Sequence, residues 1–417
     1  MAFPVSRLLI ARCMFDDPLQ IRVTGLSSRQ DVVLRASATD ERGSNFSSWA
    51  EFRADHSGQV DLSRDAPLSG SYSGVQPMGL LWSLSPEVPH RKFFKNQALS
   101  PHVVSFSVVD KQDGQILAQE TNERCILGDG VQRQTVTEQG FTGVLFTPPG
   151  LLRAVSRGAR PPLLPSEKRA GLLANKGFVV MTVPVFTGKP DQTERLHLDQ
   201  YEAAVQYLLQ HSQVGSAEVG VVALSKGADM ALSLAAFVQG VGAVVWINGC
   251  SANAGLPLFY KQQQILPALR ADLSKCIALS SDLYMVKNAM PIPTSAEHSN
   301  TVVPIEKASA QFLFVASEDD QNWDSMAFME QMVERMKRHG RNNFEVISYP
   351  RAGHLLDTPF SPFEVSAFHG FGKRAVLWGG EPEAHARAEV QLWKKIQEFF
   401  RKHLKCDITR QLYVYPL

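Results

Sequence analysis

Apolar and polar positions alternate at short range over the first third of the chain. The alternation is clearest in four segments: LQIRVTGL (19–26), DVVLRASA (31–38), SSWAEFRAD (47–55) and VVSFSVVD (103–110). A period of two is typical of strands with one buried face, and Asp113-Gly114 is typical of a hairpin turn. The pattern predicts an all-β sandwich domain over residues 1–140.

Farther along, buried runs of strand length alternate with helical patterns. The predicted strands are GFVVMTVPV, VGVVAL, GAVVWI, QFLFVA and NFEVISYP, and the predicted helices are LHLDQYEAAVQYLLQH, KGADMALSLAAFVQ, SMAFMEQMVERMKRH and PEAHARAEVQLWKKIQEFFRKHL. Alternation of this kind favours a mostly parallel sheet with helices on both faces. We predict a second, α/β domain over residues 141–417.

Ser225 stands at one of the predicted strand-to-helix junctions. It follows VGVVAL and precedes KGADMALSLAAF, with Gly227 two positions later. A sharp turn that exposes a nucleophilic serine needs small residues on both sides, and Ala223 stands where glycine is usual. The alternative is that Ser225 only caps the helix, because serine is a favoured N-cap residue. The local pattern leaves both interpretations open.

A serine nucleophile needs a base, and the base needs an orienting acid. Glu318, Asp319, Asp320 and Asp324 follow the predicted strand QFLFVA, and His354 follows NFEVISYP. Serine, acid and histidine in this order, each after a strand, are predicted to meet at the carboxyl edge of the sheet. Only one of the four carboxylates can be the acid, and Asp324 is expected to cap the next helix.

Five other histidines have weaker contexts for catalysis. His211 and His339 fall at predicted helix ends, His385 and His403 lie in the last helix, and His369 is expected in a loop. For all five we expect a surface or packing role.

Composition excludes several classes of partner. Lys and Arg (42) nearly balance Asp and Glu (41), so no net field recruits nucleic acid or an anionic membrane.

The five cysteines form no C-x-x-C pair and no zinc-like spacing, and their number is odd. This usage favours reduced thiols and no structural metal.

Targeting signals are weak in the sequence. The apolar patch near the N-terminus is broken by Arg7 and Arg12, and the longest apolar region, about 230–247, is interrupted before the ~20 residues that a membrane helix needs. The final YPL is not an S-K-L type peroxisomal address. We expect a cytoplasmic protein with no membrane span.

Several motifs together are those of a known family. They are FDDPLQIRVTGL, GVQPMGLLWSLSPE, VVALSKGADMALSLAAF, WINGCSAN, VVPIEKA, FLFVASEDDQNWDS, YPRAGHLLDTP and WGGEPEAHARAEVQLWKKIQEFFRKHL. From about Phe15 to Leu404 the chain resembles the type I acyl-CoA thioesterase / bile acid-CoA:amino acid N-acyltransferase family, and within it the thioesterases most. The resemblance implies an immunoglobulin-like β-sandwich followed by an α/β-hydrolase domain, and hydrolysis of long-chain fatty acyl-CoA.

The resemblance also assigns roles to residues. It implies Ser225 as nucleophile, His354 as base, Asp320 as acid and the backbone amide of Lys226 as an oxyanion donor, with acyl-CoA as substrate and no cofactor or metal. Members that conjugate bile acids to amino acids have cysteine at the nucleophile position, and a thioester is the better acyl donor to amines. Serine favours hydrolysis, with N-acyl transfer as the alternative. Acyl chain length and oligomeric state stay open.

One segment departs from the family pattern. The family has an apolar strand and a glycine-rich loop, source of the second oxyanion donor, where this chain has LLRAVSRGARPPLLPSEKRAG at 151–171. Proline lacks the N–H that a central strand needs. One interpretation is a diverged loop whose Arg153, Arg157 and Arg160 reach the CoA phosphates. The other is a frame-shifted or mis-spliced stretch of preserved length. A non-catalytic relative would then be the alternative, because losing one oxyanion donor costs ~10²–10³ in rate.

Overall fold

The computed structural model describes residues 11–138, 140–149, 167–186, 192–211, 214, 216–369 and 374–404. The chain divides into two compact units. The first is Met1–Gly128 together with Asp357–Ala367, and the second is Asp129–Leu356 together with Phe368–Leu417. The short segment 357–367 therefore returns to the first unit after the long excursion through the second.

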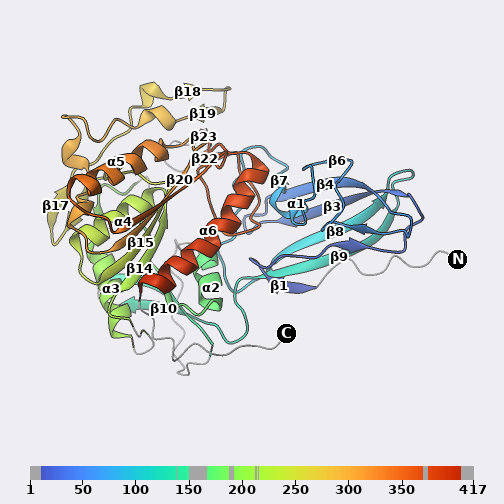
Figure 1. Cartoon of the computed structure of the whole chain (residues 1–417), viewed down its shortest axis with the longest axis horizontal. Helices are drawn as coiled ribbons and strands as arrows, with labels where there is room; N and C mark the ends of the chain where they lie inside the picture. Colours follow the sequence, from blue (N-terminus) through green and yellow to red (C-terminus); the bar gives the residue numbers. More distant parts are fainter. Residues whose placement is uncertain are drawn as a thin grey trace. The chain divides into compact units, whose positions relative to one another are not determined.

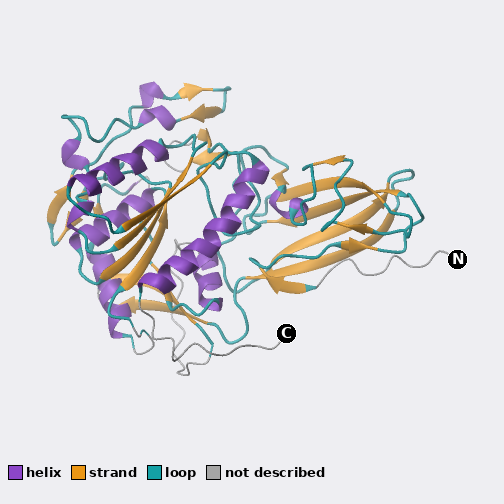
Figure 2. Cartoon of the chain, viewed as in Figure 1, coloured by secondary structure: helices purple, strands orange, loops and turns teal. Residues whose placement is uncertain are grey.

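The first unit consists mainly of strands (Figure 2). Its elements are β1 (Arg12–Met14), β2 (Arg22–Val23), β3 (Asp31–Thr39), β4 (Asn45–Arg53), β5 (Val60–Asp61), β6 (Ser69–Gly70), α1 (Gly79–Trp82), β7 (Ser85–Pro86), β8 (His102–Asp110) and β9 (Ile116–Cys125). The large sheet has the order β1-β9-β8-β3-β4-β6, with β7 also paired to β4, and β2 pairs with β5 in a separate two-stranded sheet.

Burial in the first unit follows the alternation in the sequence. In β3 the side chains of Val32, Leu34 and Ala36 are buried and the positions between them are more exposed. β8 and β9 pair antiparallel on either side of the Asp113-Gly114 turn. The β-rich N-terminal region predicted from the period of two is therefore confirmed.

The second unit holds the remaining elements. They are β10 (Gln132–Glu138), β11 (Phe141–Thr147), α2 (Glu167–Asn175), β12 (Val180–Thr182), β13 (Leu196–His197), α3 (Asp199–Gln210), β14 (Val219–Leu224), α4 (Lys226–Phe237), β15 (Val241–Ile247), β16 (Leu258–Tyr260), β17 (Gln263–Leu266), η2 (Leu273–Lys275), β18 (Ile277–Ala278), β19 (Leu283–Met285), η3 (Lys287–Ala289), η4 (Ser299–Thr301), η5 (Ile305–Lys307), β20 (Gln311–Ser317), α5 (Ser325–Arg338), β21 (Phe344–Tyr349), β23 (Arg374–Leu377) and α6 (Pro382–His403). The strand β22 (Ser366–His369) begins at the end of the segment that returns to the first unit.

A parallel sheet of order β14-β15-β20-β21 organises the second unit (Figure 1). One face, with Trp246 and Phe314, packs in the core that α4 and α5 cover. On the other side Phe400 of α6 lies so close to β14 that a Cβ on Gly220 would come within 2.7 Å of its ring. Helices on both faces bury the central strands β15 and β20 almost completely, whereas the edge strands β14 and β21 are mostly half-buried. Burial on both faces explains the continuous apolar runs of the central strands. The predicted α/β fold class of the C-terminal part, with a parallel sheet and helices on both faces, is confirmed.

Two local details differ from the sequence prediction. His369 ends the strand β22, which belongs to the sheet β18-β19-β23-β22, and does not lie in a loop. Four residues with one buried side chain give too short a pattern to be recognised as a strand. Asp324 does occupy the N-cap position of α5, but its side chain makes no capping hydrogen bond. It lies 3.7 Å from the ammonium group of Lys287 instead.

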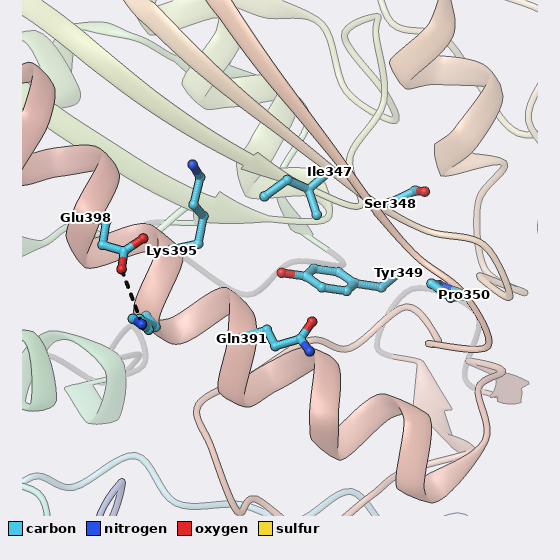
Figure 3. A pocket seen from close by; sticks show the side chains of 8 residues that line it. Ile347, Ser348, Tyr349, Pro350, Gln391, Lys395 and Glu398 are labelled. Carbon is cyan, nitrogen blue, oxygen red and sulfur yellow. Dashed lines mark ion pairs between the residues drawn. The ribbon is translucent and has the colours of Figure 1, made fainter.

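A shallow hollow lies between β21 and α6 (Figure 3). It has a volume of about 450 Å³ and is lined by Ile347, Ser348, Tyr349, Pro350, Gln391, Lys394, Lys395 and Glu398. None of the residues predicted to carry chemistry lines it, so the candidate site is elsewhere. Among the described helices, none combines the length and apolar character that crossing a membrane requires.

Candidate active site

Ser225 occupies the turn between β14 and α4. Its backbone has φ 57° and ψ −130°, and its amide donates to the carbonyl of Ile247 at 2.9 Å. A positive φ is uncommon for serine, and such strain persists only where the surroundings fix it. Ser225 stands at the N-cap position of α4, yet its side chain makes no capping bond. The interpretation as a simple helix cap is therefore wrong.

The small residues around the turn pack closely. A Cβ on Gly227 would lie 3.4 Å from the Cβ of Ala223. This is the near limit of ordinary van der Waals contact, so alanine fits where glycine is usual. A larger side chain at either position would push the two arms of the turn apart.

The structure brings Ser225, His354 and Asp320 together. The hydroxyl of Ser225 lies 2.9 Å from Nε2 of His354, and Nδ1 of His354 lies 2.7 Å from Oδ2 of Asp320. His354 is fully buried and Asp320 is 1% exposed. The three side chains come from the ends of β14, β20 and β21, as parallel strands allow.

The remaining hydrogen bonds of Asp320 hold its carboxylate in place. Oδ1 accepts from the backbone amides of Asn322 and Trp323 at 2.9 and 3.0 Å, and Oδ2 also accepts from the hydroxyl of Ser325 at 2.6 Å. A carboxylate that accepts this many bonds has little freedom to turn. The orientation of His354 is fixed in consequence.

The other three carboxylates have different partners. Glu318 accepts from the hydroxyl of Ser348 at 2.7 Å. Asp319 accepts from the amide of Gly380 at 2.7 Å, and Asp324 faces Lys287. Among the four candidates, Asp320 is the one bonded to His354.

His354 is held by its backbone and ring as well. Its amide donates to the carbonyl of Trp378 at 2.9 Å, and its carbonyl accepts from the side-chain amide of Asn248 at 2.7 Å. The imidazole stacks on the Trp378 ring, with centroids 5.4 Å apart and an interplanar angle of 16°. In the sequence nothing singles out Asn248 except its place directly after a buried strand.

His385 of α6 braces the loop that carries His354. The amide of Gly353 donates to Nδ1 of His385 at 3.1 Å, and Nε2 of His385 lies 3.1 Å from the carbonyl of Leu355. Nδ1 of His385 accepts in the first contact, and Nε2 faces an acceptor in the second. A packing role was expected for His385, but contact with both neighbours of His354 was not visible in the sequence.

The loop Trp378-Gly379-Gly380 crosses between the loop that carries Asp319 and Asp320 (the acid loop) and the loop that carries Gly353 and His354 (the histidine loop). A Cβ on Gly353 would lie 2.1 Å from the carbonyl oxygen of Gly379, and a Cβ on Gly379 would lie 2.0 Å from that of Asp319. No side chain fits at either place. The two glycines allow backbone segments to touch, which fixes the spacing of Asp320 and His354.

Lys226 follows the serine and begins α4. The first amides of a helix have no intrahelical acceptor, so the Lys226 amide is able to donate a hydrogen bond to an anion that forms next to Ser225.

The side chain of Lys226 reaches Oδ2 of Asp229 at 2.7 Å and Oδ1 of Asn253 at 3.1 Å. Burial raises the pKa of Asp229 above its ordinary value, against the opposing charge of Lys226. Within the described residues, Oδ1 of Asp229 accepts no hydrogen bond.

Most of the departing segment, residues 151–166, lies outside the described residues, and Arg153, Arg157 and Arg160 lie outside them too. Its last residues, 167–171, belong to α2. Across the described ranges, no cluster of three or more His, Cys, Asp or Glu side chains is arranged to hold a metal ion.

Comparison with known proteins identifies relatives over nearly the whole chain. Mouse acyl-coenzyme A thioesterase 5 is 37% identical over 406 residues, covering 94% of this chain and 95% of its own. Human acyl-coenzyme A thioesterase 1 is 38% identical over 405 residues, with 94% and 95% covered. Mouse peroxisomal succinyl-coenzyme A thioesterase is 35% identical over 423 residues, with 98% and 99% covered.

Among solved structures, a puromycin-hydrolyzing peptidase of Mycobacterium tuberculosis matches with a TM-score of 0.44 at 12% identity, over 89% of this chain and 54% of that chain. Two family models match the sequence. "Acyl-CoA thioester hydrolase/BAAT N-terminal region" matches residues 16–138, and "BAAT / Acyl-CoA thioester hydrolase C terminal" matches residues 196–406. The chain belongs to the acyl-CoA thioester hydrolase/BAAT family.

Proposed function

We propose that this protein hydrolyses long-chain fatty acyl-CoA to free fatty acid and CoA, with Ser225 as nucleophile. The observation that carries the proposal is the 2.9 Å contact between the Ser225 hydroxyl and Nε2 of His354, whose other nitrogen bonds Asp320. Family membership supplies the substrate class, since its relatives are named acyl-coenzyme A thioesterases.

The first half of the cycle transfers the acyl group to the protein. Nε2 of His354 takes the proton of Ser225 as Oγ attacks the thioester carbonyl, and Asp320 holds the imidazole in the required tautomer. The amide of Lys226 donates to the oxyanion. The C–S bond then breaks, and the CoA sulfur leaves with the proton from Nε2.

The second half releases the acid. Water gives a proton to Nε2 and attacks the acyl-serine ester, and the Ser225 oxygen recovers the proton as the ester bond breaks. An ester on serine is a poorer acyl donor to amines than a thioester on cysteine. Ser225 therefore favours water as the acceptor.

Release of CoA from acyl-CoA tests the proposal. We expect the wild type to cleave a long-chain acyl-CoA, and the Ser225→Ala variant to lose at least about 10⁴-fold in rate. Neither glycine nor taurine should change the products. An N-acyl amino acid product would show the transferase reaction instead, and folded wild type that releases no CoA from any chain length would contradict catalysis.

A cytoplasmic location is part of the proposal. Four cysteines in the described part of the chain, Cys13, Cys125, Cys250 and Cys276, carry free thiols, as suits a reducing compartment. Relatives include proteins named mitochondrial and peroxisomal. Fractionation of cells that express the full chain is expected to recover it in the cytosolic fraction, and recovery with either organelle would contradict this location.

A further inference from the structure

Asn322 touches both partners of the Asp320–His354 pair. Its backbone amide donates to Oδ1 of Asp320 at 2.9 Å, and its side-chain nitrogen Nδ2 lies 3.3 Å from Nε2 of His354. Asn322 is 2% exposed, so bulk water does not compete for these contacts. It stands two residues after Asp320, and its side chain takes no part in the proposed cycle of Ser225, His354 and Asp320.

The atom that Asn322 faces is the one that carries the proton in the proposed reaction. Nε2 of His354 also contacts the Ser225 hydroxyl, at 2.9 Å. A neutral imidazole has one acceptor nitrogen. Nδ1 carries the N–H that donates to Asp320, so the acceptor is Nε2. The amide must direct its N–H toward Nε2, because its oxygen would face the lone pair of another acceptor. Two donors therefore share this lone pair in the resting protein.

We propose that Asn322 is a further catalytic residue, whose amide donates to Nε2 of His354 and favours the neutral, proton-accepting form of the base. This inference rests on the proposed function of Ser225, His354 and Asp320. The Asp320 carboxylate favours the charged form of the imidazole, and a neutral donor on the opposite nitrogen acts against it. What matters at this position is thus a polar side chain without a negative charge.

The charged and titratable groups around His354 form a background that substitution of Asn322 leaves in place. They are Asp320 and Asp319 in the acid loop, Lys226 of α4 beside Ser225, Arg169 of α2 on the carbonyl of Leu356, His385 and Glu389 of α6, and His369 of β22 against Trp378. Because they are unchanged, a shift in the pH profile of a variant reports on the group placed at position 322.

Two variants and a matched control test the inference. Asn322→Asp places a carboxylate against Nε2, and Asn322→Ala removes the donor. Gln321→Ala alters a neighbouring amide that bonds Asp319 at 2.6 Å. The rate of Ser225 modification by a fluorophosphonate, followed by intact mass, reports nucleophile activation without any thioester. The same proteins are assayed for kcat/KM on acyl-CoA across pH, and thermal unfolding checks their fold.

We expect the acidic limb of both profiles to move up by about one pH unit or more in Asn322→Asp, because an opposite charge at this distance favours the imidazolium. Asn322→Ala should move it in the same direction by less, and Gln321→Ala should leave it in place. Folded Asn322 variants whose profiles coincide with the wild type would overturn the inference. Ser225 that is modified while acyl-CoA stays intact contradicts the proposed substrate and leaves this inference standing. Wild type whose Ser225 resists the fluorophosphonate overturns both.

Discussion

The side-chain amide of Asn248 donates to the backbone carbonyl of His354 at 2.7 Å, and its oxygen accepts from the amide of Ser317 at 2.7 Å. Asn248 itself has φ 45°, a conformation that asparagine tolerates better than most residues. It directly follows Ile247, whose carbonyl holds the Ser225 amide. The Asn248 side chain thus connects the end of β20 to the loop of His354, and the residue before it bonds the Ser225 amide through its backbone.

Replacing Asn248 by alanine is expected to lower kcat by about 100-fold while KM changes little, because small misplacements of a catalytic group cost this much. Stability should fall by about 1–3 kcal/mol, since the buried partners lose their hydrogen bonds. Steady-state kinetics and urea unfolding measure both effects. A variant with the stability loss and an unchanged kcat would show that Asn248 supports only the fold.

Gly353→Ala tests the close crossing of the loops. The new Cβ would lie 2.1 Å from the carbonyl oxygen of Gly379, so one loop must shift. We expect a loss of about 1–3 kcal/mol in stability and a fall in kcat of at least about 10-fold.

The matched control for Gly353→Ala is Gly340→Ala. Gly340 lies just after α5 with φ 66°, and a Cβ added there would meet no atom within 4 Å. This control should reduce stability through backbone strain and leave kcat unchanged. Equal activity losses in the two variants would contradict a specific role for the crossing.

Removing only one member of the Lys226–Asp229 ion pair, next to Ser225 in the chain, should lower the free energy of unfolding strongly. Lys226→Met leaves the fully buried carboxylate of Asp229 without its cation, at a cost of about 3–5 kcal/mol. Combining it with Asp229→Leu should recover much of this loss, because both charges are then gone. A double-mutant cycle by urea unfolding measures the coupling.

The exposed pair of Arg338 and Glu334, 3.5 Å apart on α5, serves as the control. Breaking that pair should cost less than about 1 kcal/mol, since solvent screens it. A coupling energy between Lys226 and Asp229 no larger than this would contradict the importance of the buried pair.

Glu345 of β21 makes a contribution to the free energy of unfolding that depends on pH. Hydrogen bonds from Lys395 at 2.6 Å and Lys402 at 2.8 Å lower the pKa of Glu345 to about 2. A carboxyl with a lowered folded pKa stabilises the fold above its unfolded pKa of ~4.3, and this stability is lost as pH falls toward about 2. After screening by solvent we expect about 1 kcal/mol.

The Glu345→Gln variant should therefore be less stable than the wild type at pH 7, and the difference should shrink below about pH 4. Urea unfolding at several pH values measures it. Glu398→Gln is the control. Glu398 pairs with Lys394 at 3.7 Å on the exposed side of α6, the helix that also carries Lys395 and Lys402. A Glu345→Gln difference that stays constant with pH would contradict the ionic origin of the effect.

Periodicity alone predicted the elements that depend on local patterns. The alternating positions of β3 and the apolar runs of β15 and β20 correspond to half-buried and fully buried strands. Because Ser225, Asp320 and His354 each follow a strand of the predicted parallel sheet, they were expected at one edge of it, since parallel strands all end on the same side. Their catalytic roles stay a proposal until activity is measured.

Residues that act across the fold could not be found in this way. Asn322 and Asn248 bond His354 from positions 32 and 106 residues away along the chain, and no sequence period connects them to it. His385 bonds its neighbours Gly353 and Leu355 from 32 and 30 residues away. His385 belongs to an amphipathic helix in which a buried histidine and a surface histidine have the same local pattern. Only packing of α6 against the His354 loop distinguishes them.

The sequence by itself determined which segments are strands or helices and the residue types available for chemistry, since these depend on neighbours within a few positions. The local pattern left four carboxylates open, and family resemblance alone favoured Asp320. In the tertiary structure Asp320, with its hydroxyl and amide donors, bonds His354, whereas Asp319 bonds Gly380. Adjacent positions in a loop point in different directions, and only the contacts that close around the loop fix which one faces the base.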